Sequence, residues 1–435
     1  MKVKSVIKYH LVILGCQMNK SDGERIRSVL DTLNFKEVED KKKADLLIYV
    51  ACSVRQSAIN RVYGQSAQWG KLRKAKKLKT ILTGCLTSFD QEKIAKRFDL
   101  ILDIKDLANW PSKIGNLFEI EKSDLKCNSY LAVPAHYESE FSAYVPIMNG
   151  CNNFCSYCVV PYTRGREISR PVKEIITEIK KLVSEGYKEI ILVGQNVNSY
   201  DGGVGFPKLL KMVNAIKGDF WIRFVTSHPK DMSAELIKTI GQSKKVCEYL
   251  HIAVQSGNNV ILKKMNRKYT INHYKELIEK LRTEIKNTRH RILKQAMIST
   301  DIIVGFPSET KKQFDDTAKL MNEIKFDLAY IARYSPRPGT AAEKLKDNVS
   351  PLEKQRREYV LTQILKQTAL ENNQAYLDQI VEVLVEGKTK NNHKYLGKTR
   401  TFKNVSFASR KNLIGQFAKI KITQVGSWGI SGDLI

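Results

Sequence analysis

The chain has 435 residues, which is long for one ordinary domain and predicts two to three compact units, with three preferred. Hydrophobic residues make up 42% and aromatic residues 9%, values that exclude a disordered, collagen-like or coiled-coil protein. Lys and Arg total 73 against 45 acidic residues, and the net charge of +28 favours a polyanionic partner.

The first apolar run, HLVILG, follows two early lysines and imitates a lipoprotein signal ahead of Cys16. Its apolar stretch is shorter than the roughly 7 to 15 residues of a secretory signal. We therefore expect a buried strand here and a cytoplasmic protein. No run reaches the roughly 18 apolar residues of a membrane span, which excludes a membrane protein.

Residues 1–130 alternate apolar runs with helix-like polar stretches, a pattern typical of a parallel α/β sheet. The runs are HLVILG, DLLIYVA and TILTG. The stretch SDGERIRSVLDTLNF predicts a helix capped by Ser21 or Asp22. One face of that helix carries the apolar residues Ile26, Val29, Leu30 and Leu33.

Each of these three apolar runs is followed at once by a cysteine, namely Cys16, Cys52 and Cys85. Because parallel strands end at one edge of their sheet, the three thiols are predicted to converge on a single site. Eight cysteines in the whole chain are too dilute for a disulfide scaffold, and clustered cysteines in a reducing compartment favour metal binding.

Residues 119–142 lose periodicity and are interpreted as a linker. Residues 137–372 then form a second alternating region, whose six apolar runs predict six βα units. Six units favour an open, partial barrel, and its gap would admit a bulky substrate. The runs are YVPIM, EIILVG, FWIRFV, YLHIAV, MISTDIIVG and LAYIARY.

Residues 373–435 form the third unit, which changes to short strands from Gln379 onward and predicts a small β-barrel. From Gln379 it holds ten Lys or Arg against three acidic residues, so a basic face for nucleic acid is the expectation. Aromatic residues interleaved with that charge suit base stacking, although strand alternation places most of them in the core. They are Tyr395, Phe402, Phe407 and Phe417.

The strongest local motif is GCNNFCSYC, which places Cys151, Cys155 and Cys158 directly after an apolar run. A structural zinc site has four protein ligands, commonly as two pairs. This motif has three cysteines, and no histidine lies nearby in the sequence. Three thiolates suit a 4Fe–4S cluster that keeps one iron open. The motif therefore favours iron–sulfur over zinc.

This motif and its extension CVVPYTRGREISRP resemble the radical S-adenosylmethionine (SAM) methylthiotransferases, specifically the MiaB type that modifies tRNA. The resemblance covers the whole chain. Further matching segments are LGCQMNKSDGERI, ACSVRQSA, LTGCL, LVGQNVNSY, FVTSHPKDM, VQSGNNVILKKMNRKYT, DIIVGFPSET, YSPRPGT and GKTRTFKNVSF. This chain departs from the family at Val50 and Ala51, where Asn and Thr are usual, and at Ser308, where Gly is usual.

The resemblance implies an N-terminal methylthiotransferase domain, a central radical-SAM barrel and a C-terminal TRAM domain. It implies two 4Fe–4S clusters, one on Cys151, Cys155 and Cys158 that binds SAM, and an auxiliary one on the N-terminal triad that takes part in sulfur delivery. The implied reaction is methylthiolation of carbon 2 of N6-isopentenyladenosine beside the anticodon of tRNA. A low-potential electron donor and a sulfur or cluster supply system are implied partners.

Other polar residues are weaker candidates. Gln195 and Asn196 follow the second barrel strand, where related enzymes place groups that contact SAM. Arg164 and Arg166 are expected to hold phosphate or carboxylate, or to lie on a solvated loop. His251 lies inside an apolar run and has the features of a core histidine. Near strand segments that could face the cavity lie Ser227, His228, His251, Gln255 and Asp301.

Two cysteines and one basic run receive no functional assignment. Cys127 and Cys247 match no family ligand and are expected to be small buried side chains. The run KLRKAKKLK could grip RNA, but a solvated helix face is the simpler interpretation.

Alternatives stay open within and outside the family. The nearest are methylthiotransferases acting on threonylcarbamoyl-adenosine in tRNA or on a ribosomal protein. A non-catalytic iron–sulfur protein that binds RNA is a further alternative, against which the open iron site argues.

Overall fold

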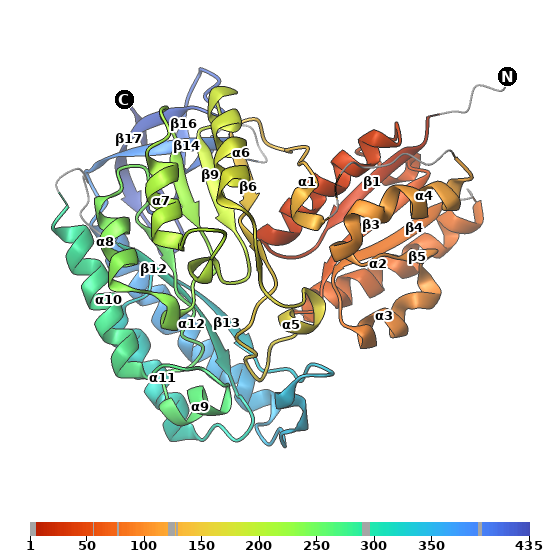
Figure 1. Ribbon diagram of the computed structural model, residues 1–435. Helices are drawn as coiled ribbons and strands as arrows, with labels where there is room; N and C mark the ends of the chain where they lie inside the picture. Colours follow the sequence, from red (N-terminus) through yellow and green to blue (C-terminus); the bar gives the residue numbers. More distant parts are fainter. Residues whose placement is uncertain are drawn as a thin grey trace.

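The computed structural model describes residues 6–54, 56–75, 78–120, 127, 129–288, 296–389 and 394–435, without the side chains of residues 70–72, 74 and 75. Figure 1 shows three units, with the N-terminal unit (red to orange) beside a central barrel and a C-terminal barrel (blue) behind it. Within the described residues no helix is long and apolar enough to cross a membrane.

The N-terminal unit is a five-stranded parallel sheet with the order β2-β1-β3-β4-β5. All seven residues of β3 are buried, because helices cover both faces of a parallel sheet. Its strands are β1 (Lys8–Ile13), β2 (Lys36–Glu37), β3 (Leu46–Cys52), β4 (Lys79–Cys85) and β5 (Leu100–Ile101). Its helices are α1 (Gln17–Thr32), α2 (Gln56–Ala75), α3 (Ser88–Ile94) and α4 (Trp110–Phe118).

The start of α1 differs from the prediction. The helix begins at Gln17, and Cys16 rather than Ser21 or Asp22 is its N-cap. Asn19 substitutes for the usual capping residue, because its side-chain oxygen accepts a hydrogen bond from the Cys16 backbone N–H at 3.3 Å. Ser21 and Asp22 therefore lie inside the helix, where both are buried.

The central unit contains six parallel strands, one for each predicted apolar run. They form two three-stranded sheets, β6-β9-β10 and β11-β12-β13, which isolated parallel bridges join at Ile222–Val246 and Ser227–Ile252. The strands are β6 (Ser142–Pro146), β9 (Glu189–Val193), β10 (Trp221–Phe224), β11 (Tyr249–His251), β12 (Met297–Val304) and β13 (Leu328–Arg333). The predicted fold class, an open partial barrel between two smaller units, is confirmed.

Amphipathic helices cover the outside of this barrel and bury their apolar faces in one continuous core. The helices of this unit are α5 (Val160–Thr163), α6 (Val172–Ser184), α7 (Phe206–Asn214), α8 (Ala234–Gln242), α9 (Asn259–Lys264), α10 (Ile271–Lys286), α11 (Lys311–Ile324) and α12 (Pro351–Gln374). The last of them leads into the C-terminal unit.

The C-terminal unit is a closed barrel with the order β14-β15-β16-β18-β17. Tyr395 and Phe407 lie in its core, as strand alternation predicts. Phe402 stacks on Tyr249 of the central barrel at 4.4 Å, and Phe417 packs against Trp221. All four aromatic side chains are therefore used for packing. The strands are β14 (Ile380–Lys388), β15 (Tyr395–Thr399), β16 (Asn404–Ala408), β17 (Phe417–Val425) and β18 (Ile430–Leu434).

Ion pairs attach this C-terminal barrel to the amino-terminal ends of the central strands. Arg400 pairs with Glu248 at 3.0 Å, just before β11, and Lys403 pairs with Asp327 at 2.8 Å, just before β13. Arg223 of β10 donates to the Thr399 carbonyl oxygen at 2.8 Å. The opposite, carboxyl-terminal ends of the strands are therefore left for the N-terminal unit and the site between them.

Candidate active site

The N-terminal triad is assembled by the register of the sheet. Cys52 and Cys85 are the last residues of β3 and β4 and stand directly opposite each other in the pairing. Cys16 follows β1 by three residues and caps α1. The hydrogen bond to Cys52 lowers the pKa of Cys85 to about 7, whereas burial raises the pKa of Cys16. The three thiols thus lie together at the carboxyl edge of the sheet.

Both triads have the ligand chemistry of an iron–sulfur cluster. Among the described residues, no three His, Cys, Asp or Glu side chains are arranged closely enough to hold one metal ion. A 4Fe–4S cluster is wider, because each thiolate binds a different iron, and it takes thiolate ligands almost exclusively. Three sulfur ligands at each site match that chemistry and leave one iron without a protein ligand. The two cluster assignments stay predictions.

The loop that carries the barrel triad is closed at its base by a short antiparallel pair, β7 (Met148–Asn149) with β8 (Ile168–Ser169). Gly150 has a φ of +85°, and an added Cβ would lie 2.0 Å from the Arg166 carbonyl oxygen. Its N–H donates to Oε1 of Gln195 at 2.5 Å. The Cys151 N–H donates to the Gly165 carbonyl oxygen at 3.2 Å. Only glycine fits at the start of this loop.

The three cysteines of the barrel triad are half-buried. Burial raises the pKa of Cys158 to about 12, and the neighbouring Cys155 contributes to this rise. Arg267 donates to the Cys155 sulfur at 3.4 Å and to the Ala253 carbonyl oxygen at 2.6 Å. Arg267 lies in a family-like segment, but no pattern in the sequence distinguishes it from neighbouring cations, so it was not predicted.

Gln195 and Asn196 both form hydrogen bonds within the protein. Gln195 accepts from Gly150 and so supports the triad loop. Asn196 is buried, donates to Oδ2 of Asp231 at 2.8 Å and accepts from the His228 backbone N–H at 3.2 Å. The structure thus gives both residues a positioning function, and their contact with SAM stays a prediction.

Of two histidines near the strand ends, His228 is neutral and His251 is hydrogen-bonded within the protein. Burial lowers the pKa of His228 to about 2, with Arg267 contributing. His251 bonds to Ser299 at 2.9 Å and to Oδ2 of Asp301 at 3.1 Å, as expected for a buried core histidine. Ser227 has a buried hydroxyl without a hydrogen-bond partner in the described part of the chain.

A cavity of about 1060 Å³ lies between the N-terminal unit and the central barrel. It is bounded by Val54, just beyond Cys52, and by Cys158 of the barrel triad. Gln255, Asp301 and Tyr330 line the barrel side. Arg337 closes one side by donating to Gln56 and to the Val54 carbonyl oxygen. The cavity thus contains one cysteine of the barrel triad and adjoins the segment that follows Cys52.

Arg164 and Arg166 have different environments although both lie on the triad loop. Arg164 holds a carboxylate, as one alternative predicted, but this is the protein's own Asp22, and the solvated-loop interpretation is wrong for this buried residue. Arg166 is exposed and lies over the Phe154 ring at 4.4 Å. Only Arg166 is free to meet a ligand from solvent.

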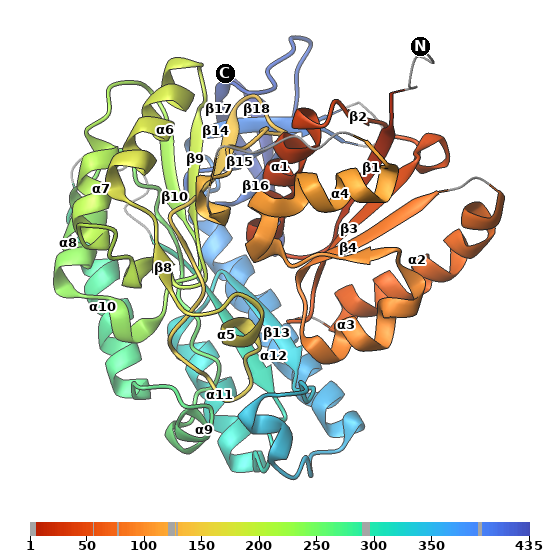
Figure 2. The same cartoon turned by 45° about the vertical axis from the view of Figure 1, so that its right-hand side comes forward.

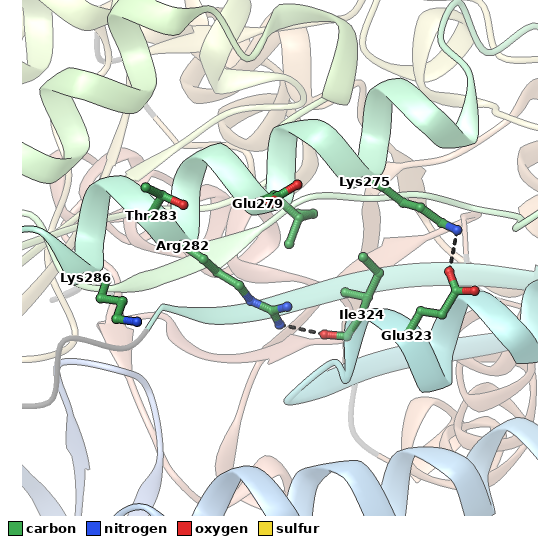
Figure 3. A pocket seen from close by; sticks show the side chains of 8 residues that line it. Lys275, Glu279, Arg282, Thr283, Lys286, Glu323 and Ile324 are labelled. Carbon is green, nitrogen blue, oxygen red and sulfur yellow. Dashed lines mark hydrogen bonds and ion pairs between the residues drawn. The ribbon is translucent and has the colours of Figure 1, made fainter.

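Figure 3 shows a smaller pocket, of about 320 Å³, on the outer helical layer between α10 and α11. Three of its charged groups bind one another or the backbone: Lys275 pairs with Glu323, and Arg282 donates to the Ile324 carbonyl oxygen at 2.6 Å. None of the eight cysteines lines it. It is therefore not a candidate for the chemistry.

The residues without a functional assignment remain so. Cys247 is buried, as predicted, beside Trp221 and Leu384 at the junction with the C-terminal barrel. Cys127 packs against the N-terminal core but is only half-buried, so the expectation of burial is wrong for it. Val50 and Ala51 are fully buried in β3. Most side chains of the basic run 71–79 lie outside the described residues.

Three family models match separate parts of the chain. Residues 145–321 match the radical SAM superfamily, residues 374–435 match the TRAM domain, and residues 8–103 match the uncharacterized protein family UPF0004. Among solved structures, the cobalamin-dependent SAM radical enzyme OxsB has a TM-score of 0.54 at 10% identity and covers 84% of this chain and 56% of its own. The methyltransferase TsrM of Kitasatospora setae has a TM-score of 0.52 at 11% identity, covering 78% and 77%. At such identities these likenesses show the fold alone.

Relatives at the sequence level are much closer. A tRNA-2-methylthio-N(6)-dimethylallyladenosine synthase of Clostridium novyi (strain NT) is 42% identical, covering 98% of this chain and 96% of the relative. A synthase of the same name from Thermoanaerobacter pseudethanolicus is 41% identical, covering 98% and 92%. Over nearly its whole length, therefore, this chain belongs to the family of tRNA-2-methylthio-N6-dimethylallyladenosine synthases, within the radical SAM superfamily.

Proposed function

We propose that this protein methylthiolates carbon 2 of N6-isopentenyladenosine next to the anticodon of tRNA. The observation that carries the proposal is the cavity of about 1060 Å³, which is bounded by Cys158 of one triad and by the segment following Cys52 of the other. A reaction that both activates a carbon and supplies sulfur needs two such sites beside one substrate.

The target explains the need for a cofactor. Carbon 2 of adenine bears an aromatic C–H bond that no side-chain acid or base can activate, so bound cofactors must supply the reactivity. When bound, a 4Fe–4S cluster with SAM supplies a strongly oxidising carbon radical, and the auxiliary cluster takes part in sulfur delivery. Cys151, Cys155 and Cys158 would hold the first cluster.

The chain's own residues contribute alignment and exclusion of water. Gly150 and Gln195 fix the triad loop against the end of β9. Arg267 places a positive charge beside Cys155 without a carboxylate partner in the described part of the chain. Arg337 bridges the two units at the edge of the cavity. The substrate base would therefore be held between two fixed walls.

RNA recognition is proposed for the exposed face of the triad loop. Tyr162 is 55% exposed, its ring meets Phe154 edge-on at 6.4 Å, and Arg166 covers the Phe154 ring. Exposed aromatic rings beside a guanidinium are suited to stack on unpaired nucleobases. The Tyr162 N–H donates to the carbonyl oxygen of Val159, a cavity residue, so this surface adjoins the cavity.

The remaining parts of the proposal concern the cellular setting. The net charge of +28 and the match to the TRAM domain support a tRNA partner. A low-potential electron donor must reduce the cluster, and a sulfur or cluster supply system must replace what is consumed. We place the protein in the cytoplasm, where tRNA is found.

Mass spectrometry of tRNA nucleosides from a deletion strain tests the function directly. The 2-methylthio derivative of N6-isopentenyladenosine should disappear and return on complementation. Loss of the threonylcarbamoyl derivative instead, or of neither, would contradict the proposal. If neither derivative is lost, the result would favour a ribosomal-protein substrate or non-catalytic RNA binding.

A cysteine-set experiment tests the division of chemistry. With Cys16, Cys52 and Cys85 changed to Ala, the reduced protein should still convert SAM to 5′-deoxyadenosine but form no methylthio product. With Cys151, Cys155 and Cys158 changed to Ala, it should do neither. Iron and sulfide analysis should find two clusters in the parent and one in each variant; stoichiometric zinc would contradict the assignment.

A further inference from the structure

Arg164 is a buried cation that connects the two cysteine sites. Its side chain and that of Asp22 are both 0% exposed. Nε donates to the Cys85 sulfur at 2.9 Å, and Nη1 donates to Oδ1 of Asp22 at 3.0 Å, with a second hydrogen bond to Oδ2. Tyr130 donates to the same Asp22 carboxylate at 2.7 Å.

The backbone of Arg164 belongs to the other site. The residue follows Cys158 by six positions and directly follows α5, which lies between the central barrel and the N-terminal unit in Figure 1 and in front of the barrel in Figure 2. Its carbonyl oxygen accepts a hydrogen bond from Asn149 at 3.3 Å, and the next residue, Gly165, accepts from the Cys151 N–H. One residue therefore touches a ligand of the N-terminal triad while being part of the loop that carries the barrel triad.

We propose that Arg164 is a positioning residue that holds the two cysteine sites in fixed relation and, together with Asp22, sets the reduction potential of the centre on Cys16, Cys52 and Cys85. This inference rests on the proposed function, because it assumes an iron–sulfur cluster on that triad. Asp22 contributes to the same function, because it orients the guanidinium of Arg164 and partly offsets its positive charge.

The two charges must act in opposite directions. Reduction adds negative charge to a thiolate-bound cluster, and hydrogen bonds and charge near the sulfurs set its potential. Arg164 favours the reduced state, because its positive charge lies at the Cys85 sulfur in a buried, poorly screened environment. Asp22 disfavours it, because its negative charge lies beside the same guanidinium in the same buried environment. A purely structural pair would not produce shifts of opposite sign.

The test uses the full-length protein with Cys151, Cys155 and Cys158 changed to Ala, so that only the N-terminal cluster remains. Its potential is measured by redox titration followed by electron paramagnetic resonance. Arg164→Gln should lower the potential by at least the equivalent of a tenfold change in the reduction equilibrium, about 59 mV for one electron. Asp22→Asn, which keeps the arginine and the side-chain shape, should raise it.

Two control variants separate this effect from general disturbance. Arg166→Gln, on the same loop but exposed, should leave the potential unchanged. Arg267 contacts the other triad through Cys155. Arg267→Gln should therefore change the reduction potential only in the reciprocal background, in which Cys16, Cys52 and Cys85 are changed to Ala. Arg164→Gln should leave the potential of that remaining barrel cluster nearly unchanged.

Shifts of the same sign for Arg164→Gln and Asp22→Asn, or no shift in either, would overturn the inference. If Arg164→Gln does not retain a cluster, Asp22→Asn still tests the inference, because its reduction potential should rise. Iron and sulfide analysis keeps the two proposals apart. Absence of a cluster in the starting background would refute the assignment of the triad and this inference with it. A full cluster with an unmoved potential would refute this inference alone.

Discussion

Replacing Gly150 by Ala should loosen the loop that carries the barrel triad. The left-handed φ of +85° costs an L-residue about 1 to 2 kcal/mol. The added Cβ would also lie 2.0 Å from the Arg166 carbonyl oxygen, so that backbone must move. Such a movement breaks the bonds from Gly150 to Gln195 and from Cys151 to Gly165, at about 1 kcal/mol each. We expect a destabilisation of about 3 to 4 kcal/mol.

Gly165 provides a matched control on the same loop. Its φ is +82°, but an added Cβ would meet no atom within 4 Å. Gly165→Ala should therefore cost only the backbone preference, about 1 to 2 kcal/mol. Urea denaturation of the cluster-free proteins measures both values, and iron content after reconstitution should fall further in Gly150→Ala. Equal losses of stability in the two variants would refute the steric argument.

Three further predictions concern single side chains. Ser308→Gly should stabilise the protein by about 1 kcal/mol in urea denaturation, because Ser308 has a φ of +64°; an unchanged midpoint would contradict this. Burial raises the pKa of Glu24 to about 8, so its proton stabilises the fold at low pH and this contribution is lost as pH rises toward 8. Glu24→Gln should therefore be more stable than the parent at pH 8 and similar to it at pH 4. The same dependence of stability on pH in both proteins would contradict this prediction. Tyr162→Ala should weaken tRNA binding by about 1 to 3 kcal/mol with an unchanged salt slope in fluorescence anisotropy, whereas a changed slope would indicate a charge contact instead.

The fold class could be predicted because its elements are long and strongly patterned. Each of the six apolar runs of the central unit corresponds to one parallel strand. Two edge strands of the N-terminal sheet, β2 and β5, were missed because each pairs over only two residues, which is too short to produce a period. The start of α1 was misplaced because a cysteine and an asparagine form the cap that a serine or aspartate usually provides.

The site residues could be predicted from the sequence only where they form a local pattern along the chain. The two cysteine sets are visible because each cysteine follows a strand or lies within a short motif. Arg164 and Asp22 are 142 positions apart, and no periodicity connects residues so distant in the chain. The same holds for Arg267, which reaches Cys155 across 112 positions. Contacts of this kind depend on how the units dock, and docking is set by surfaces rather than by sequence period.

The N-terminal unit and the C-terminal barrel dock at opposite ends of the central strands. The C-terminal barrel is fixed to the amino-terminal ends of the central strands by the buried pair Lys403–Asp327 and by Arg400–Glu248, whose arginine is partly exposed. The N-terminal unit is fixed at the opposite ends by Arg164 and Arg337. Breaking a buried pair by removing one partner costs about 3 to 5 kcal/mol, so neither junction is expected to open easily. Under the proposed function, a tRNA that contacts the C-terminal barrel has to extend along the central barrel to present its anticodon base at the cavity, since the protein's own junctions keep the two ends apart.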